Sequence, residues 1–410
     1  MGTILVLFTN MDLRSHSPYP LLRHGIVSNF SSLKKDIRTE VAIIGAGISG
    51  ALVAWYLHHA GFKVVVLDRR HAAMGSTAAS TALLQYEIDV PLRELVKKVG
   101  EKNAIESYLL CRESIYTIGK LCHQLRDKTL YREKPSFQFA SFKKDVMPLY
   151  EEYLIRKKNG LSLQWLEPDQ IEKKYGFKKS AGLLSADGAE LDVYKMTHLM
   201  LQKCKRGGME IYDNTGIEKI RHDKKGVELI TAENNKVHAR WLVIACGYES
   251  QRYIPQQIEN LHSTFAIASE TFEQKDFWYK NSLIWETADP YLYIRTTSDN
   301  RIIIGGKDVD FTNPVKRDAL ISTKARALEK SFAQLFPSIR FKTDFSWTGT
   351  FGTTKDGLPY IGSIPQRPNT FFALGFGGNG ITFSVIAAEI IRAELLKKNN
   401  PYKNIFSFRR

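Results

Sequence analysis

The chain of 410 residues is long enough for two or three domains, and its 43% of hydrophobic residues is the ordinary share of a globular protein with a sizeable core. The net charge of +15 favours anionic partners such as an acidic membrane, nucleic acid or acidic substrates, although the basic residues are scattered in small groups, as on a solvated surface. Four cysteines without a Cys-x-x-Cys pair argue against a disulfide framework, a zinc site and a redox dithiol, and they indicate a reducing compartment, the cytoplasm.

The N-terminal segment "MGTILVLFTN" contains a short apolar run, but no basic residue precedes it, so no signal peptide is expected. Met11 is a second candidate for the natural start. We expect residues 1–36 to form an arm ahead of the first folded unit.

An uncharged run over residues 41–57 admits two interpretations. One is a membrane anchor, but only 17 residues are available, three of them glycine, whereas a membrane helix needs about 20 apolar residues. The other is a strand at Val41–Ile44, a glycine-rich turn, a helix over Ile48–Ala60 and a second strand over Phe62–Leu67, closed by Asp68. This order predicts a βαβ unit and excludes the anchor.

Within this unit the motif Gly45-x-Gly47-x-x-Gly50 predicts a dinucleotide cradle. Gly45 makes the tight turn, Gly47 lets the backbone approach a pyrophosphate, and Gly50 lets the helix pack on the strand. The N-terminus of the helix supplies N–H groups and a positive dipole end. Asp68, 18 positions after Gly50, is placed to accept hydrogen bonds from an adenosine ribose. Further expected contacts of the nucleotide are Ala46, Ile48, Ser49 and Arg69.

The segments after this unit decide between NAD and FAD, because βαβ units bind both. An NAD dehydrogenase usually continues with further βαβ units, whereas Pro91–Leu125 has apolar residues at helical spacing. A helix over Met196–Arg206 and a strand over Trp241–Ala245 follow, and the strand ends in Cys246-Gly247, a small-residue turn suited to face a nucleotide. Only one βαβ unit with a Gly-x-Gly-x-x-Gly turn is present, so no second site for NAD(P)H is expected.

The C-terminal part predicts a second glycine-rich turn. A strand over Thr370–Leu374 leads into the turn Gly375–Gly380, and a helix begins at about Ile381. The N-terminus of this helix would direct N–H donors and a positive dipole end at a ligand. The alternative is a tight connection between strand and helix without a ligand.

Together these motifs resemble the D-amino-acid oxidase and glycine oxidase family of FAD-dependent oxidoreductases. The resemblance rests on the first βαβ unit, "GSTAAS" at Gly75–Ser80, the strand end "VIACGY" and the close "DGLPYIG…GFGGNGIT", and it extends from Thr39 to about Leu396. It implies an α/β fold (α+β overall), in which a Rossmann-like FAD-binding domain is assembled from residues 37–90, 185–250 and 345–410. A substrate domain with an antiparallel sheet would be formed by residues 91–184 and 251–344.

The resemblance also assigns the FAD contacts. In the family the first glycine cluster holds the pyrophosphate, the loop at Gly75–Ser80 passes along the flavin, and the C-terminal glycine turn lies by the isoalloxazine ring. The residues expected at the last two places and after the Trp241–Ala245 strand are Ser76, Thr77, Ala78, Ser80, Ala245, Cys246, Gly247, Gly375, Gly377, Gly378, Asn379, Gly380, Ile381 and Thr382.

Non-covalent FAD is expected. Relatives that bind flavin covalently use a Cys before the "DG-x-P" loop or a His just after "GST", and this chain has neither. His71, a few residues upstream, is the remaining candidate for an attachment. No metal site is expected.

The segment that contacts a substrate carboxylate departs from the family. Glycine oxidase and D-amino-acid oxidase relatives carry an Arg in "G-x-R-P-x-T-x-DG-x-P", which pairs with the carboxylate. Here the segment reads "GTFGTTKDGLP", and Phe351 stands at the position of that Arg. Phe351 would form an apolar wall of the substrate site or fill the core, and a simple α-amino acid would lose its main ion pair.

A second candidate for substrate binding is a hairpin around residues 298–300. On its first arm Tyr291, Tyr293 and Arg295 alternate and should share one face, where two phenols and a guanidinium would bind a carboxylate or cap a polar amine. A solvated face with a surface Arg is the alternative. The pattern is similar to the γ-glutamylputrescine oxidase branch. Lys307 is a candidate for activating O2, as a lysine does in sarcosine oxidase relatives, although its position does not match well.

The resemblance implies oxidation of the C–N bond of an amine or amino acid by hydride transfer to flavin N5, with O2 or a quinone as acceptor. The basic surface would suit a peripheral contact with an acidic membrane. Two other classes stay open: a flavin domain acting in tRNA modification, which requires one contiguous basic stripe, and a protein that binds FAD without turnover. Because the basic residues are scattered, the sequence favours a small-molecule enzyme over a protein that binds nucleic acid.

Overall fold

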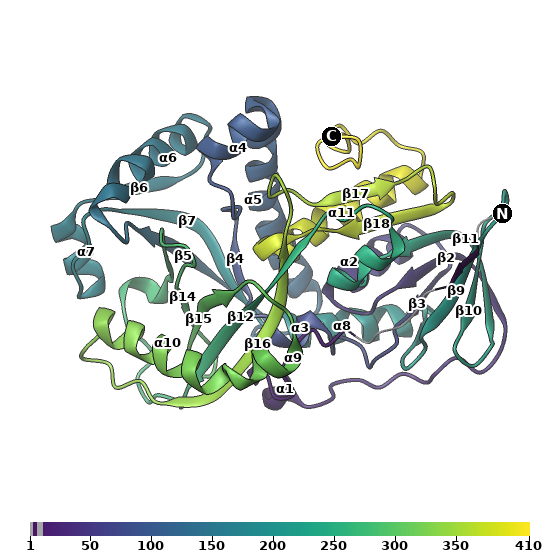
Figure 1. Cartoon of the computed structure of the whole chain (residues 1–410), viewed down its shortest axis with the longest axis horizontal. Coiled ribbons are helices and arrows are strands. Elements are labelled where there is room, and N and C mark those ends of the chain that lie inside the picture. Colours follow the sequence, from purple (N-terminus) through teal and green to yellow (C-terminus); the bar gives the residue numbers. More distant parts are fainter. Residues whose placement is uncertain (1–2, 6–10) are drawn as a thin grey trace.

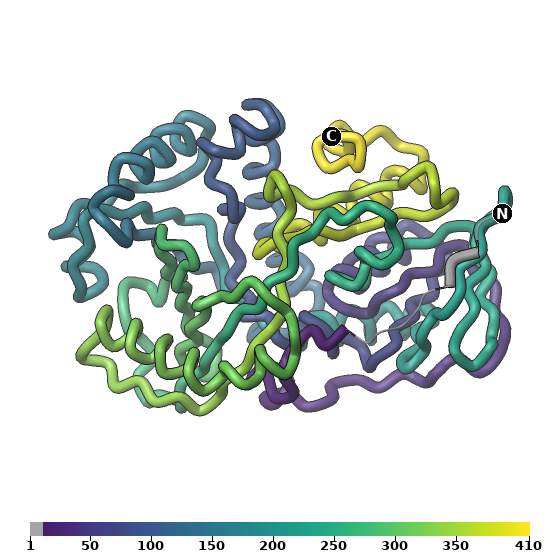
Figure 2. The backbone as a smooth tube through the Cα atoms, viewed as in Figure 1, coloured from purple at the N-terminus to yellow at the C-terminus, as the bar shows by residue number. Residues whose placement is uncertain are grey.

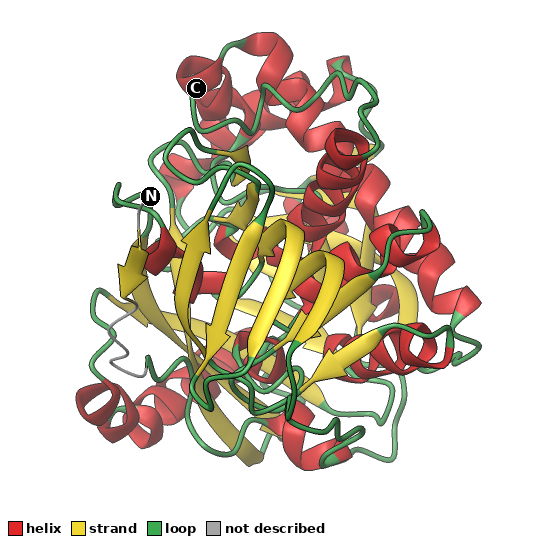
Figure 3. Ribbon diagram, turned by 90° about the vertical axis from the view of Figure 1, so that its right-hand side faces the viewer, coloured by secondary structure: helices red, strands yellow, loops and turns green. Residues whose placement is uncertain are grey.

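The structure, a computed structural model, describes residues 3–5 and 11–410. The chain forms two lobes that lie side by side, each built on one sheet (Figure 1). From the side of the first sheet, strands run through the middle of the molecule and helices lie around them (Figure 3). The expectations about a signal peptide and the natural start fall largely on residues 1–2 and 6–10, which lie outside the described part.

The first sheet contains the predicted βαβ unit. Its order is β1-β9-β10-β11-β2-β3-β8, with β18 beside β11 and β17 beside β18. The strands from β18 through β11, β2 and β3 to β8 are parallel. The bounds are β1 Thr3–Leu5, β2 Ile37–Ile44, β3 Val64–Leu67, β8 Glu210–Tyr212, β9 Ile217–His222, β10 Val227–Thr231, β11 Lys236–Ile244, β17 Tyr360–Ser363 and β18 Thr370–Leu374.

Strand β2 is apolar along its second half because both of its faces are covered. Val41 and Ile43 pack in the core formed with helix α2, whereas Ala42 and Ile44 pack in the core on the opposite face. Alternate strand residues point to opposite faces, so a strand buried on both sides reads as one apolar run. The uncharged run 41–57 is therefore a buried strand and helix. Among the described residues, no helix is both long enough and apolar enough to span a membrane.

Helices α2, α8 and α11 cover one face of the parallel strands, and α5 packs on α11. The expected helix over residues 91–125 is two helices, because Gly100 between them has φ 83° and ends the first. The helices are α1 Tyr19–His24, α2 Ile48–His59, α3 Ser76–Ala79, α4 Leu92–Val99, α5 Glu101–Gln124, α6 Val146–Lys158, α7 Pro168–Tyr175, α8 Val193–Arg206, α9 Pro314–Ala319, α10 Ile321–Leu335 and α11 Gly380–Leu395.

The second sheet has the order β16-β12-β15-β14-β13-β5-β7-β4, with β6 beside β7. Its pairs are antiparallel except for β13 with β5. Its strands are β4 Leu83–Gln85, β5 Tyr131–Phe139, β6 Leu163–Leu166, β7 Gly182–Leu191, β12 Asn260–Ser269, β13 Leu283–Glu286, β14 Tyr293–Thr296, β15 Ile302–Val309 and β16 Thr343–Thr353. The predicted combination of a parallel and an antiparallel sheet is confirmed. The expected domain boundaries at residues 185 and 345 fall inside β7 and β16.

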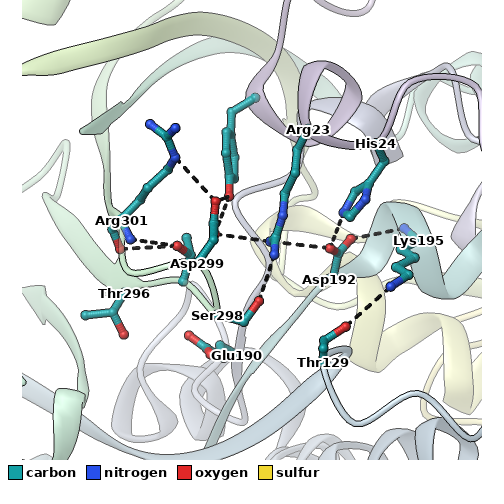
Figure 4. A network of polar contacts seen from close by, with 12 residues as sticks. Arg23, His24, Thr129, Glu190, Asp192, Lys195, Thr296, Ser298, Asp299 and Arg301 are labelled. Atoms are coloured by element: carbon teal, nitrogen blue, oxygen red, sulfur yellow. Dashed lines mark hydrogen bonds and ion pairs between the residues drawn. The ribbon is translucent and has the colours of Figure 1, made fainter. Parts of the chain in front are cut away.

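Residues 11–36 of the N-terminal arm run from the junction of the two lobes along the outer edge of the lobe that holds the first sheet (Figure 2). Its segment 13–15 pairs with β16, where Thr350 N–H donates to Leu13 O at 2.8 Å and Ser15 N–H donates to Thr348 O at 3.1 Å. Helix α1 then joins the two lobes, because Arg23 lies 3.6 Å from Asp192 before α8 and 3.3 Å from Asp299 at the tip of the β14–β15 hairpin (Figure 4). Residues 11–36 of the arm are thus part of the folded unit.

Candidate functional site

A large cavity lies between the two sheets. The first sheet contributes the C-terminal end of β2 and the turns after β11 and β18, and the second sheet contributes residues of β12, β14, β15 and β16. Ligands of parallel sheets bind beyond the carboxyl ends of the strands, and this cavity has that position. Leu13 of the N-terminal arm also lines the cavity, which no sequence motif predicts.

Most of the residues predicted to contact FAD line this one cavity. They are Gly45, Gly47, Ile48, Ser49, Asp68, Arg69, Ser76, Thr77, Ser80, Ala245, Cys246, Gly247, Gly375, Gly377, Gly378, Asn379, Gly380, Ile381 and Thr382. Ala46, Gly50 and Ala78 do not line it. Ala46 N–H donates to Asp68, Gly50 packs on the Gly45 carbonyl, and Ala78 is buried beside Tyr194.

The glycines of the first turn are required by close backbone approaches. Gly45 has φ 112°, and a Cβ there would lie 2.5 Å from the carbonyl oxygen of Ala245. A Cβ on Gly50 would lie 1.8 Å from the carbonyl oxygen of Gly45, which is the close helix–strand packing expected of it. Gly47 is extended and directly precedes α2, so its backbone stands at the N-terminus of the helix.

Asp68 is held by the backbone of the cradle. Its carboxylate accepts hydrogen bonds from Ala46 N–H at 2.7 Å and from Arg70 N–H at 2.8 Å. Burial raises the pKa of Asp68 to about 6, and these two hydrogen bonds oppose that rise. Asp68 thus fixes the turn that it follows, and its contact with a ribose stays a prediction.

Arg70 and Glu249 were not expected at this end of the cavity. Glu249 is buried in the 3₁₀ segment Gly247–Tyr253, and its carboxylate pairs with Arg69 and, at 2.9 Å, with Arg70. Both arginines also donate to the carbonyl oxygen of Met11. The two consecutive arginines after Asp68 were the only visible signal, since Glu249 lies far along the chain.

The C-terminal glycine turn is fixed by the segment that follows β4. Gly378 N–H donates to Asp89 Oδ2 at 2.7 Å, and Asn379 Nδ2 donates to the carbonyl oxygen of Glu87 at 2.8 Å. Helix α11 begins at Gly380, directly at the cavity. The predicted turn and helix are confirmed, and the positive dipole end of α11 faces the cavity.

The second sheet forms the opposite wall. Register pairs Thr264 with Gly349 and Ala266 with Trp347, and all four residues line the cavity. Phe351, two positions further along β16, lines it as well, and its ring lies 5.3 Å from that of His262. Phe351 is therefore a wall residue, and the alternative that it fills the core is excluded by its position.

The predicted group of Tyr291, Tyr293 and Arg295 is divided. Both tyrosines line the large cavity, whereas Arg295 lines a smaller one on the α1 side. Arg295 is 6% exposed, donates to the carbonyl oxygens of Thr81 and Thr296, and lies 3.8 Å from Glu190. Its guanidinium is thus buried and bonded within the protein. The hypothesis that Arg295 binds the substrate and the alternative that it is a surface residue are therefore both wrong.

Lys307 does not reach the cavity either. Between the pairs Phe265–Gly306 and Ser263–Val309, β15 contains one residue more than β12, and Lys307 has φ 60° in this bulge. A bulge reverses the order in which side chains alternate. As a result Asp308 lines the cavity, while Lys307 lies near Lys324 of α10.

Two acidic groups on this wall were missed: Asp308 and Glu259. Burial raises the pKa of Asp308 to about 6, and Asp308 Oδ1 has no hydrogen-bond partner. Glu259, just before β12, is 2% exposed, and burial raises its pKa to about 8. Gly375 N–H approaches the Glu259 carboxyl group, but no contact to either oxygen has hydrogen-bond geometry. Neither residue belongs to a motif.

Glu259→Gln is expected to change how stability depends on pH. The folded chain keeps the Glu259 proton up to a pH of about 8, whereas the unfolded chain releases it near 4.5. Wild type should therefore lose stability relative to the Gln variant as pH rises between these values, by on the order of a few kcal/mol. Denaturant titrations across this range measure the difference. The exposed Glu273→Gln should show no such trend, and parallel curves for Glu259→Gln and wild type would contradict the assignment.

The described residues fit FAD. They provide a glycine cradle at the N-terminus of α2, a second helix N-terminus at α11, and a cavity that reaches from one to the other. Within residues 3–5 and 11–410, no group of three or more His, Cys, Asp or Glu side chains is arranged to hold a metal ion. His71 does not line the cavity and lies 3.3 Å from Asp213.

Comparison with known proteins agrees with this geometry. The model of the DAO family, described as FAD dependent oxidoreductase, matches residues 40–394, and the chain belongs to this family. It is therefore an FAD-dependent oxidoreductase.

Two curated relatives and one solved structure illustrate the similarity. Gamma-glutamylputrescine oxidoreductase of Escherichia coli (strain K12) is 24% identical over 90% of this chain and 86% of its own length. Glycine oxidase of Geobacillus kaustophilus (strain HTA426) is 24% identical over 88% of this chain and 93% of its own. The crystal structure of glycine oxidase from Geobacillus kaustophilus superposes with a TM-score of 0.75 at 20% identity, covering 89% of this chain and 96% of that one.

Proposed function

We propose that the protein oxidises the C–N bond of a small amine or amino acid in the cavity between the two sheets. A hydride leaves the carbon for N5 of non-covalently bound FAD, and O2 or a quinone finally accepts the two electrons. The observation that carries this proposal is the single cavity that joins the predicted FAD cradle to a wall of Tyr291, Tyr293 and Phe351. The two curated relatives are named for their action on gamma-glutamylputrescine and on glycine, and these names support an amine or amino acid as the substrate class.

In this reaction the protein's own side chains bind the substrate and orient it. The bond to hydrogen breaks with both electrons leaving as hydride, so the substrate nitrogen must carry a free lone pair to form the C=N bond of an iminium, which water then hydrolyses to a carbonyl compound. Placement of the C–H bond supplies most of the rate in such a reaction. Trp347 and the rings of Tyr291, Tyr293 and Phe351 form the wall that would position it.

An anaerobic screen tests the function. The purified yellow holoprotein is mixed with primary amines, secondary amines and amino acids, and bleaching of the flavin band is recorded. At least one class should bleach the flavin, and re-oxidation by air or by a soluble quinone identifies the acceptor. A flavin that no C–N compound bleaches, while a reductant such as dithionite does, would contradict the proposal.

A further inference from the structure

The acidic groups on the cavity fall into two sets. Asp68 is bound by backbone N–H groups, and Glu249 is paired with Arg69 and Arg70, so these two carboxylates are already neutralised by the protein. Glu259 and Asp308 are different, because no Lys or Arg of the described residues forms an ion pair with either. Lys324 of α10 interacts electrostatically with Asp308, but its side chain lies with Phe265 on the face of the sheet away from the cavity.

The positive groups on the cavity are all at the nucleotide end. Among the described lining residues, the arginines are Arg69, Arg70 and Arg252, which follow β3 or lie in the segment Gly247–Tyr253, and no lysine lines the cavity. The wall formed by the second sheet therefore offers a substrate two carboxyl groups and, among the described lining residues, no Lys or Arg, while His262 lies beside Phe351 without lining the cavity. A carboxylate placed there would have no counter-ion.

The phenols of Tyr291 and Tyr248 lie within electrostatic reach of the two acidic groups. Burial raises the pKa of Tyr291, and the charges of Asp89 and Asp308 raise it further. Burial likewise raises the pKa of Tyr248, together with the charges of Glu259 and Asp89. This wall is polar and electronegative, and Glu259 in particular is a buried carboxyl group without a hydrogen-bond partner. Asp308 lines the cavity without a cationic side chain beside it, so a ligand that brings a positive charge fits this wall.

We propose that the substrate is a cationic amine without a carboxylate on the carbon that is oxidised, and that Asp308 is the counter-ion of its ammonium group. This inference rests on the proposed oxidation of a C–N bond in this cavity. The ammonium pairs with the carboxylate of Asp308, and one proton then leaves to water before the hydride can depart. Phe351, in the place where the relatives carry an arginine, contacts the hydrocarbon part of the amine.

Charge selectivity can be measured without turnover. tert-Butylamine and 2-aminoisobutyrate differ only by a methyl group in place of the carboxylate, and neither has a hydrogen on the carbon next to nitrogen, so neither is oxidised. Calorimetric titration of the oxidised holoprotein should give at least about tenfold tighter binding of tert-butylammonium. Equal binding, tighter binding of 2-aminoisobutyrate, or no binding of either compound would overturn the inference.

Variants assign the preference to Asp308. Asp308→Asn should weaken tert-butylammonium binding about ten- to hundredfold, because a charge-assisted hydrogen bond is lost, and Asp308→Glu should restore part of it. The control is Asp310→Asn, two positions along, whose side chain is 95% exposed and pairs with His262 outside the cavity. Flavin content confirms that each variant is folded. An unchanged dissociation constant in Asp308→Asn, with its flavin retained, would overturn the role of Asp308.

Turnover separates this inference from the proposed function. Isopropylamine and D-alanine form the matching oxidisable pair, and 1,4-diaminobutane and ornithine form a longer one. Faster anaerobic bleaching by the amine of each pair supports the inference. Faster bleaching by the amino acid overturns it and leaves the proposed C–N oxidation standing, whereas a flavin that none of the four bleaches overturns both.

Discussion

Gly47→Val is expected to give a folded protein that purifies without FAD. Gly47 has φ −77° and ψ −174°, an extended conformation that valine adopts readily, so the backbone of the variant is not strained. An added Cβ would meet only the side-chain oxygen of Thr77, at 3.1 Å. Its methyl groups would enter the cavity at the N-terminus of α2, where the backbone must approach the pyrophosphate.

The ratio of flavin to protein absorbance measures this effect, and it should fall at least about tenfold. Circular dichroism and the unfolding temperature, compared with those of wild type stripped of FAD, should show a preserved fold. Gly160→Asn is the matched control, because Gly160 has φ 77°, a Cβ there meets nothing within 4 Å, and asparagine tolerates this conformation. A yellow Gly47→Val protein with full flavin content would contradict the assignment of the cradle.

Arg156→Met is expected to destabilise the protein by about 3–5 kcal/mol. Arg156 of α6 is 2% exposed, lies 2.6 Å from Glu152 and 3.4 Å from Glu87, and stacks near the rings of Tyr86 and Tyr108. Its removal leaves two buried carboxyl groups without a cation. Even beside Arg156, burial raises the pKa of Glu87 to about 7, so deprotonation of Glu87 in the variant would be costly.

Chemical denaturation measures this loss, and the double variant Arg156→Met/Glu87→Gln should recover part of it, since one unpaired carboxylate is then absent. Glu152 is left unchanged because it also accepts hydrogen bonds from the backbone N–H groups of Leu92 and Arg93 at the start of α4. The exposed ion pair of Lys34 with Glu233 is the control, and Lys34→Met should change stability by no more than about 1 kcal/mol. A loss for Arg156→Met as small as that of the control would contradict this account.

The cofactor half of the site could be predicted from the sequence because it depends on local motifs. Gly45, Gly47 and Gly50 serve one turn and one helix N-terminus, and the C-terminal turn at Gly375–Gly380 has the same character. Backbone requirements of this kind leave a fixed spacing of residue types. The strand, turn and helix that they predict are therefore found with shifts of only a few residues at their ends.

The substrate half could not be predicted in the same way. Alternation over residues 291–295 correctly placed Tyr291, just before β14, with Tyr293, but the cavity ends before Arg295, which pairs with groups from distant segments. The bulge in β15 places Asp308 instead of Lys307 at the cavity, and simple alternation of strand residues cannot reveal the extra residue of a bulge. Glu259 stands in no motif. The positions that decide substrate charge thus depend on tertiary register.

A single turnover with a labelled substrate tests the central claim most directly. The best amine of the screen is mixed anaerobically, at saturation, with the yellow holoprotein, either unlabelled or with deuterium on the carbon next to nitrogen. The account predicts one carbonyl product for each flavin bleached and bleaching that is slowed several-fold by deuterium, because that C–H bond breaks as hydride leaves. Bleaching without a carbonyl product would contradict oxidation of the C–N bond by this protein.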